Sequence, residues 1–217
     1  MVDALVEAGV VTSGAVEQAM RHVARHCFLP GEDVATAYAD MAVVFKRSAQ
    51  GQPLSSASQP TMVAAMLELL DVRRGQRVLE VGTGTGYNAA LLSALVGPDG
   101  SVVTVELEED LAEGAARVLA ATGAGPVEVV CGDGGAGHQP GAPYDRIIVT
   151  VGAPALEVAW TAQLVDGGRV VAPIVGGDGI GSVVVADKVG GALERRSEVP
   201  CGFLLMRSTA STPPATC

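Results

Sequence analysis

The sequence predicts an α/β protein in which a mostly parallel sheet carries helices on both faces. Two observations lead to this prediction. Short apolar runs alternate with stretches of helical periodicity along most of the chain, which is the pattern of parallel strands joined by crossover helices. One run, at 78–81, stops at Gly82, Gly84 and Gly86, and a helical pattern follows at once. A strand, a glycine turn and a helix in this order bring backbone N–H groups close to a ligand.

The elements of this core follow from the same pattern. Each predicted strand is a short Val- or Ile-rich run, and each predicted helix has a stripe of apolar residues. Gly97-Pro98-Asp99-Gly100 ends one of the helices, and Gly167-Gly168 are predicted to cap the last one. Strands are predicted at 78–81, 102–105, 127–131, 147–151 and 169–174, and helices at 61–70, 88–96, 110–121 and 155–164.

The region before this core predicts helices and a loop. Residues 13–25 predict an amphipathic helix with Ser13 as its N-cap, and residues 32–40 predict a further turn of helix. Residues 41–45 predict an edge strand. Residues 46–60 are rich in Ser, Gln, Gly and Pro and predict a long loop, of the kind that often carries function.

The region after the core changes character. Residues 182–189 and 193–199 alternate in polarity around Gly190-Gly191, which predicts a hairpin. The polar residues 208–217 predict a flexible tail. We therefore expect a single domain over 1–207. Its parts are 1–60 with the N-terminal helices and a substrate loop, 61–181 with the cofactor-binding core, and 182–207 with the hairpin.

Composition and charge exclude several classes of protein. With 217 residues and 48% hydrophobic content the chain can form one sizeable core. The net charge of −10 argues against nucleic acid, and no apolar run is long enough to span a membrane. The acidic N-terminus is unlike a signal peptide, and the four cysteines form no C-x-x-C motif. His22, His26 and Cys27 lack a further ligand cluster. We expect a cytoplasmic monomer without a metal, a nucleic-acid partner or a membrane partner.

The glycine turn indicates what kind of ligand it binds. In the dinucleotide fingerprint the third glycine comes five residues after the first. Here Gly86 comes four residues after Gly82, and Tyr87 stands where that fingerprint has glycine. Glu80, just before the turn, disfavours a pyrophosphate, whereas a cationic or neutral nucleoside tolerates it. A glycine-rich turn without any ligand remains open on this motif alone.

Acidic residues lie at the ends of three predicted parallel strands. Glu80, Glu106 and Asp133 should therefore meet at the carboxyl edge of the sheet, where α/β proteins bind ligands. Glu106 lies 24 residues after Gly82, near the distance at which an acid accepts hydrogen bonds from a ribose. Asp133 can accept a hydrogen bond from an exocyclic amine such as that of adenine. Each acid alone fits a solvated turn, but the three together favour a nucleoside site.

The motifs resemble those of a known family. Glu80-Val81-Gly82-Thr83-Gly84-Thr85-Gly86 is similar to the first motif of the S-adenosylmethionine-dependent methyltransferases. Over about residues 16–203 the order of the motifs resembles that of the protein-L-isoaspartate O-methyltransferases. The SSxSxP and C-G-F motifs resemble the actinobacterial branch, which includes aspartyl O-methyltransferases that tailor precursor peptides. The family motifs are Ser58-Gln59-Pro60, 78–88, Val105-Glu106, Cys131-Gly132-Asp133-Gly134, Ala142-Pro143-Tyr144-Asp145 with Ile147-Ile148-Val149-Thr150, and Gln163-Leu164 with Gly167-Gly168.

This resemblance implies a Rossmann-like methyltransferase fold with a seven-stranded sheet whose last strands depart from the usual order. It also implies S-adenosyl-L-methionine as cofactor, with S-adenosyl-L-homocysteine as product. Ser58 is implied to be the catalytic residue at the acceptor, and the substrate is expected to contact Ser58, Gln59, Thr61, Arg47 and Arg207. The cofactor is expected to contact Glu80, Gly82, Thr83, Gly84, Gly86, Tyr87, Asn88, Glu106, Leu107, Asp133, Gly134 and Thr150.

The implied chemistry needs little from side chains. A carboxylate with a pKa of about 4 is already ionised near neutral pH, so no general base is required. Transfer from a sulfonium can then be accelerated by orientation in a water-poor pocket. A hydroxyl such as that of Ser58 can hold the carboxylate without protonating it. Arg47 and Arg207 are candidates for binding an acidic peptide, although both could be simple surface residues.

The expected function is esterification of a side-chain or isoaspartyl carboxylate in a peptide or protein, which leads to succinimide and isoaspartate interconversion. Three features depart from the family pattern and leave the substrate open: a longer loop before Ser58, Thr61 in place of His or an aromatic residue, and Leu205-Met206-Arg207 near the C-terminus. Tailoring of one Asp in a precursor peptide therefore competes with general repair. Two functions outside this chemistry also compete with it, those of a nicotinamide oxidoreductase and of a non-catalytic peptide-binding relative.

Overall fold

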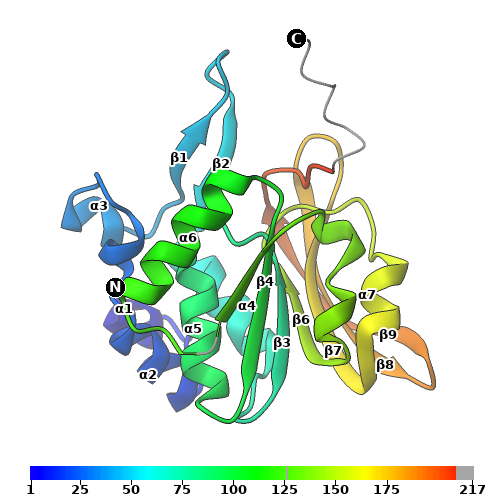
Figure 1. The fold of residues 1–217 in the computed structure, drawn as a ribbon. Coiled ribbons are helices and arrows are strands. Elements are labelled where there is room, and N and C mark those ends of the chain that lie inside the picture. The colour runs from blue at the N-terminus through cyan, green and yellow to red at the C-terminus, as the bar shows by residue number, and fades with distance from the viewer. Residues whose placement is uncertain (126, 209–217) are drawn as a thin grey trace.

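The computed structural model, shown in Figure 1, describes residues 1–125 and 127–208. Its centre is a seven-stranded sheet with the strand order β5-β4-β3-β6-β7-β8-β9. Strands β3 to β7 pair in parallel, and β8 and β9 add to one edge as an antiparallel pair. The strands are β3 (Arg77–Val81), β4 (Ser101–Glu106), β5 (Val127–Cys131), β6 (Tyr144–Val149), β7 (Leu164–Val175), β8 (Ile180–Val189) and β9 (Ala192–Gly202).

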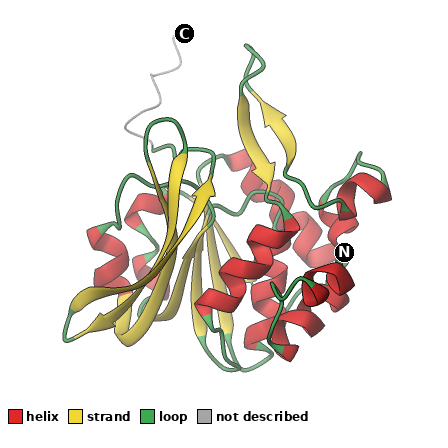
Figure 2. Ribbon diagram, turned by 180° about the vertical axis from the view of Figure 1, so that it is seen from behind, coloured by secondary structure: helices red, strands yellow, loops and turns green. Residues whose placement is uncertain are grey.

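Helices cover both faces of this sheet (Figures 1 and 2), so the predicted α/β fold is confirmed. The longest helices follow β3 and β4 or precede β3. In the part of the chain that the structure describes, three short 3-10 helices lie in the connections. The α-helices are α1 (Val2–Glu7), α2 (Gly14–His22), α3 (Val34–Tyr38), α4 (Pro60–Leu70), α5 (Tyr87–Val96), α6 (Glu109–Ala121) and α7 (Val158–Gln163), and the 3-10 helices are η1 (Arg25–Phe28), η2 (Gly134–Ala136) and η3 (Gln139–Gly141).

Two apolar cores lie on opposite faces of the sheet. Alternate residues of a strand enter different cores: Val78 packs in one, with α1, α2, α4 and α5, and Leu79 packs in the other, with Trp160 of α7. Ile148 and Ile147 of β6 divide in the same way. The central strands are therefore buried on both faces, which explains why they read as continuous apolar runs in the sequence.

The prediction of a long loop at 46–60 is wrong. Strands β1 (Val43–Arg47) and β2 (Pro53–Ala57) pair antiparallel in a separate two-stranded hairpin, which projects beyond the main sheet (Figure 1). The predicted strand at 41–45 therefore belongs to this hairpin and not to the edge of the main sheet. Val43 and Ala57 at the base of the hairpin pack against Leu29 and Ala37 in a small third core. This tertiary packing and the pairing of the two strands are not visible in the local sequence, which is polar.

The boundary between α7 and β7 also differs from the prediction. The helix ends at Gln163, and β7 begins at the next residue, so Gly167-Gly168 lie inside a strand and do not cap a helix. Tyr144 pairs with Leu164 and Arg146 pairs with Arg169, with an irregularity between the two pairs. The glycines accommodate this bulge, because Gly167 has a φ of 78° that other residues rarely adopt.

At the chain ends the prediction holds in part. The hydroxyl of Ser13 accepts a hydrogen bond from the Val16 amide and caps α2, as predicted. That helix ends at His22, three residues before the predicted end, and η1 begins at Arg25. The predicted hairpin is formed by β8 and β9, and Gly190-Gly191 both have positive φ. The predicted tail lies outside the described residues except for Ser208. None of the helices within 1–125 and 127–208 could cross a membrane.

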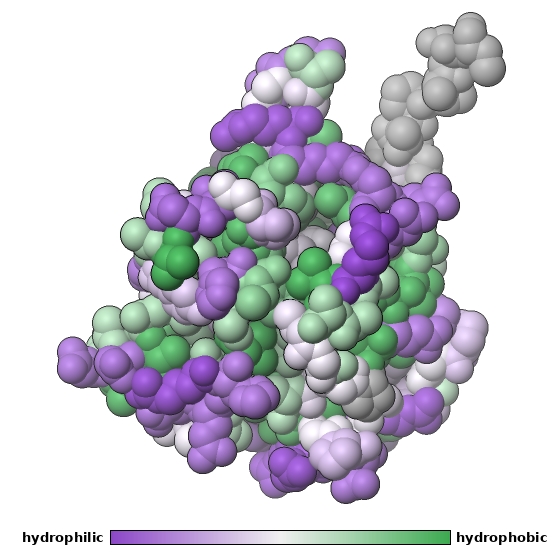
Figure 3. Space-filling model, turned by 60° about the vertical axis from the view of Figure 1, so that its left-hand side comes forward, coloured by the Kyte–Doolittle hydropathy of each residue, from purple (hydrophilic) through white to green (hydrophobic). Residues whose placement is uncertain are grey.

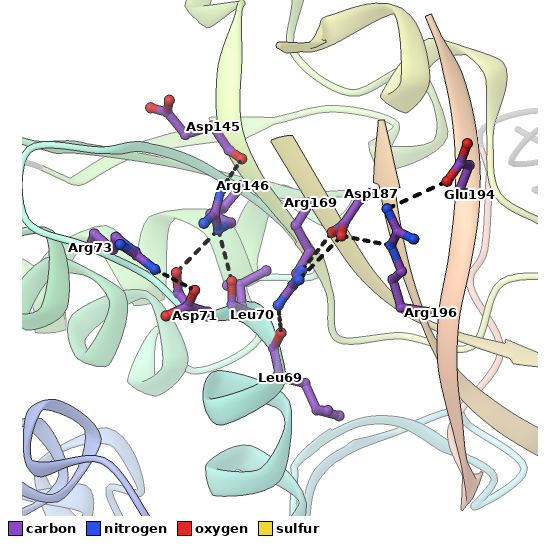
Figure 4. A network of polar contacts seen from close by, with 10 residues as sticks. All are labelled: Leu69, Leu70, Asp71, Arg73, Asp145, Arg146, Arg169, Asp187, Glu194 and Arg196. Atoms are coloured by element: carbon purple, nitrogen blue, oxygen red, sulfur yellow. Dashed lines mark hydrogen bonds and ion pairs between the residues drawn. The ribbon is translucent and has the colours of Figure 1, made fainter. Parts of the chain in front are cut away.

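Near the start of β6, two arginines bind the carbonyl end of α4 (Figure 4). Arg146 Nε donates to the carbonyl of Leu70 at 2.8 Å, and Arg169 Nη1 donates to the carbonyl of Leu69 at 3.0 Å. Arg169 also forms an ion pair with Asp187 of β8, with Nε 2.7 Å from Oδ1. The last carbonyls of a helix have no partner within the helix, so these contacts fix α4 against the sheet.

We expect Arg169→Ala to lower the free energy of unfolding by about 2 kcal/mol, because it removes one of the two arginines that pair with Asp187 and leaves the Leu69 carbonyl without its side-chain donor. Arg195→Ala is the matched control, because the Arg195–Glu198 pair is largely exposed, and it should cost less than about 1 kcal/mol. Urea denaturation monitored by circular dichroism measures both values. Equal losses in the two variants would contradict the role given to Arg169.

Candidate functional site

A cavity of about 460 Å³ opens at the carboxyl edge of the parallel strands, within the usual range for small-molecule sites. It lies beside β3, where the strand order turns from β4 on one side to β6 on the other. The hairpin projects above this region, and hydrophilic side chains gather around its base (Figure 3). The walls of the cavity include Arg25, residues 53–59, Met62, Val63, Met66, residues 81–85, Tyr87, Asn88, residues 105–107, Gly134, Ile148, Thr150, Val151 and residues 202–207.

The glycine loop between β3 and α5 forms one wall of the cavity. Gly82, Gly84 and Gly86 have φ values of 97°, 54° and 86°, in the region that favours glycine. A Cβ atom on Gly82 would also lie 2.6 Å from Thr150 Oγ1, so this position has no room for a side chain. Thr150 Oγ1 donates to the carbonyl of Gly82 at 2.6 Å. The loop is therefore held in one shape by its own backbone and by Thr150, the residue after β6.

Glu80 lies behind the glycine loop and is fully buried. Its carboxylate accepts hydrogen bonds from Asn88 Nδ2 at 2.8 Å and from Thr104 Oγ1 at 2.6 Å. The Thr104 hydroxyl lies 2.7 Å from that of Thr83 in the loop. Burial raises the pKa of Glu80 to about 7, although the bonds from Thr104 and Asn88 favour the charged form. Glu80 thus supports the loop and does not line the cavity.

Glu106 at the end of β4 does line the cavity. Its Oε2 accepts a hydrogen bond from the Gly84 amide at 2.9 Å, and its Oε1 accepts one from the Glu108 amide at 3.3 Å. These bonds place the carboxylate beside the glycine loop. Asp133 precedes η2 and accepts a hydrogen bond from the Gly135 amide at 2.9 Å, and its neighbour Gly134 lines the cavity. The three predicted acids thus lie at one edge of the sheet, but only Glu106 lines the cavity. Glu80 is buried behind the glycine loop, and Asp133 is next to the lining residue Gly134.

The structure brings most of the predicted site residues into one cavity. Those that line it are Ser58, Gln59, Gly82, Thr83, Gly84, Tyr87, Asn88, Glu106, Leu107, Gly134, Thr150 and Arg207.

The other predicted residues lie around this cavity. Glu80, Gly86 and Asp133 support the loops behind it. Thr61 Oγ1 lies 2.6 Å from Asp40 Oδ2, and Arg47 Nη1 donates to the carbonyl of Gly51 within the hairpin at 3.1 Å.

Sequence reasoning missed a charged cluster that joins three distant segments at the cavity rim. Glu108, next to β4, forms ion pairs with Lys46 of the hairpin and with Arg207 of the C-terminal segment. Lys46 Nζ also lies 2.7 Å from Asp110 Oδ2. Burial alone would raise the pKa of Glu108, but the hydrogen bonds from Lys46 and Arg207 hold it below the usual value. These partners are 62 and 99 residues from Glu108, so no local pattern indicates them.

Within the described ranges, no group of three or more His, Cys, Asp or Glu side chains could hold a metal ion. The polar groups of the cavity are the Glu106 carboxylate, hydroxyls, the side-chain amides of Gln59 and Asn88, backbone amides and the arginines Arg25 and Arg207. This set can bind a ligand that carries hydroxyl groups and charges of both signs.

The chain is similar to known proteins along most of its length. The family model described as protein-L-isoaspartate(D-aspartate) O-methyltransferase matches residues 1–210. The chain is 42% identical over 206 residues to a protein-L-isoaspartate O-methyltransferase of Methanopyrus kandleri, which covers 94% of this chain and 88% of that protein. It is 44% identical over 170 residues to the protein of the same name from Ignicoccus hospitalis, which covers 78% of each chain.

Two solved structures share the fold. A protein-L-isoaspartate O-methyltransferase superposes with a TM-score of 0.86 and 33% identity over 94% of this chain, which spans 64% of the length of that structure. A putative protein-L-isoaspartate O-methyltransferase from Plasmodium falciparum, in complex with S-adenosyl-L-homocysteine, superposes with a TM-score of 0.80 and covers 96% of this chain and 97% of its own. Because its identity is 19%, that likeness concerns the fold alone.

The buried carboxyl of Glu80 should make stability depend on pH. Its pKa is raised in the folded protein, so the folded state binds more protons than the unfolded state between about pH 4.5 and 7. The contribution of Glu80 to the free energy of unfolding is therefore largest at low pH and is lost as the pH rises through 7. Glu80→Gln, which resembles the protonated form, lacks this dependence.

Urea denaturation at pH 4.5 and pH 8 measures this effect. Relative to Glu80→Gln, the protein with Glu80 should lose roughly 3 kcal/mol between the two pH values. Parallel pH profiles of the two proteins would show that Glu80 keeps its ordinary pKa in the folded state.

Proposed function

The chain belongs to the protein-L-isoaspartate(D-aspartate) O-methyltransferase family, and from this premise we propose that it esterifies a side-chain or isoaspartyl carboxylate in a peptide or protein. The observation that carries the proposal is the arrangement of one cavity. The glycine loop and Glu106 form one side of it, and Ser58 and Gln59 line it as well. A nucleoside cofactor and an acceptor can therefore occupy it together.

The residues of the first side fit S-adenosyl-L-methionine. Glu106 offers a carboxylate for the two ribose hydroxyls, and it already binds the glycine loop through the Gly84 amide. We place the flat base beside Gly134, which lines the cavity next to Asp133. The glycines bring the backbone close to the ligand without a side chain in between. When bound, this cofactor supplies a methyl group on a sulfonium, and S-adenosyl-L-homocysteine is the product.

The residues of the acceptor side hold and orient a carboxylate. The acceptor is already ionised near neutral pH, so transfer requires no general base. An oxygen–methyl bond forms as the methyl–sulfur bond breaks, and both charges are neutralised. The Ser58 hydroxyl makes no hydrogen bond with another described residue, and its backbone carbonyl is held by Arg25 at 2.9 Å. The free hydroxyl can therefore donate to the acceptor.

The methyl ester is an activated acyl group. Attack by the neighbouring backbone amide nitrogen releases methanol and forms a succinimide, which hydrolyses to aspartate or isoaspartate. Repair of isoaspartate in many proteins and tailoring of one Asp in a precursor peptide use this same chemistry. Tailoring, as in the actinobacterial branch, is the second candidate. It is supported by the position of two departures from the family pattern, the hairpin and residues 205–207, because both line the cavity.

A peptide assay separates these candidates. We expect methyl transfer from labelled S-adenosyl-L-methionine to an isoaspartyl peptide, followed by succinimide formation detected by mass spectrometry, and no transfer to the same peptide with ordinary Asp. Transfer to one Asp of a precursor peptide encoded nearby, without transfer to isoaspartyl peptides, would establish tailoring. Thermal stabilisation by NAD but not by S-adenosylhomocysteine would favour an oxidoreductase. Cofactor binding without any transfer would indicate a non-catalytic relative.

We expect Ser58→Ala to lower kcat about 10- to 100-fold, because the loss of one orienting hydrogen bond raises the barrier by about 1.4 to 2.8 kcal/mol. The Kd of S-adenosylhomocysteine should change less than about twofold, since the hydroxyl faces the acceptor. Ser56→Ala, at another serine of the cavity wall, is the control and should leave kcat nearly unchanged. Equal losses of kcat and of cofactor affinity in Ser58→Ala would place Ser58 on the cofactor side.

A further inference from the structure

Arg25 is a charged side chain in an unusual position. It lies in η1, its exposed fraction is 1%, and it forms part of the cavity wall. No carboxylate of the described residues forms an ion pair with it, although other arginines nearer the surface are paired. Burial lowers its pKa, and Asp40, which lies beyond ion-pair distance, offsets a small part of this effect; a guanidinium remains charged in proteins. A buried positive charge without a carboxylate is costly unless a ligand supplies the negative charge.

The contacts of Arg25 leave one arm of its guanidinium unused. Nε donates to the carbonyl of Ala37 and Nη2 donates to the carbonyl of Ser58, each at 2.9 Å. The guanidinium carbon lies 4.9 Å from the centre of the Tyr87 ring, close enough for a cation–π interaction. Nη1 is buried and has no hydrogen-bond partner. Arg25 thus fixes the backbone of Ser58, and its Nη1 nitrogen is still without an acceptor.

Tyr87 also has a buried polar atom without a hydrogen-bond partner. Its hydroxyl is buried without a partner, and the two such side-chain atoms found among the described residues belong to Arg25 and Tyr87. Burial raises the pKa of Tyr87 to about 12, so the hydroxyl keeps its proton and can donate. Both residues line the cavity. Buried polar atoms without partners are rare in native proteins, so two in contacting residues of one cavity wall indicate a missing acceptor.

We propose that Arg25, with the hydroxyl of Tyr87, binds the carboxylate of the acceptor peptide. The inference rests on the proposed function. In it, Arg25 supplies the positive charge that binds the acceptor carboxylate. The position favours the acceptor over the cofactor, because the same guanidinium holds the carbonyl of Ser58. The two arginines that the sequence suggested for binding the acceptor are less suited to this role. Arg207 forms an ion pair with Glu108, and Arg47 donates to the Gly51 carbonyl within its own hairpin.

This role explains how an acidic protein can bind an acidic ligand. The chain has a net charge of −10, which repels a carboxylate at long range. A single buried cation in a water-poor wall acts more strongly on a nearby anion than a surface charge does. The amino-acid carboxylate of the cofactor has the same chemistry as that of the acceptor, so the test must distinguish the two sources.

The test compares an isoaspartyl peptide with its neutral carboxamide analogue. Their Kd values are measured by calorimetry with S-adenosylhomocysteine bound, for the wild-type protein and for Arg25→Gln, Arg25→Lys and Arg47→Gln. We expect the wild type and Arg47→Gln to bind the acid about tenfold or more tightly than the amide. Arg25→Gln should bind the two peptides within about twofold, and Arg25→Lys should retain part of the preference. The Kd of S-adenosylhomocysteine should change less than about threefold in all variants.

Each other outcome overturns the inference. If Arg25→Gln keeps the full preference for the acid, Arg25 does not bind the acceptor carboxylate, and a parallel loss of S-adenosylhomocysteine affinity would assign Arg25 to the cofactor. Equal wild-type affinities for acid and amide overturn the inference without any variant, so it does not depend on how the variants fold. A wild-type protein that methylates neither isoaspartyl nor Asp peptides refutes the proposed function instead.

Discussion

The buried carboxyl of Glu80 is the contact on which the geometry of the cavity depends. It joins the end of β3 to Thr104 of β4 and to Asn88 at the start of α5, and through Thr104 it reaches Thr83 in the glycine loop. The removal of a carboxyl group from water is costly, and these hydrogen bonds offset part of that cost. Because three elements meet at one side chain, the loop between them has little freedom to move. A rigid loop can place its backbone amides and glycines against a ligand with little loss of entropy on binding.

The second constraint is that the cavity is closed by segments far apart in the chain. The parallel strands supply its floor, as is usual at the carboxyl edge of such sheets. Its other walls include Arg25 of η1, the hairpin, Ser58 and Gln59 with the first turns of α4, and residues 202–207 at and after the end of β9. Glu108 joins the hairpin to the C-terminal segment through Lys46 and Arg207. The cofactor side of the site is thus built at the ends of the central strands, and the acceptor side largely by segments outside the parallel sheet.

Charge is distributed unevenly around this site. Glu106 and the buried Glu80 lie on the side that we assign to a cationic sulfonium nucleoside, and Arg25 lies beside Ser58 on the side that we assign to an anionic acceptor. The positive sulfonium would therefore bind on the side of the acids, and the negative acceptor carboxylate would bind on the side of Arg25. The transfer neutralises both, so the neutral ester is held less strongly than the carboxylate. This difference would favour release of the product.

The sequence by itself determined the parallel core, the glycine loop and the edge at which ligands bind, because these depend on residues close together in the chain. The apolar run at 78–81, the spacing of Gly82, Gly84 and Gly86, and the acids after the strands are all local patterns. The β8–β9 hairpin was predictable for the same reason, since its strands flank a two-glycine turn. Only the tertiary structure decided the hairpin of β1 and β2, which folds because Val43 and Ala57 pack against Leu29 and Ala37. It likewise decided that Glu80 supports the loop while Glu106 lines the cavity, and that Arg25 lies beside Ser58, 33 residues away. Such roles depend on which distant side chains become neighbours in the fold. The sequence pattern of a single element cannot predict these contacts.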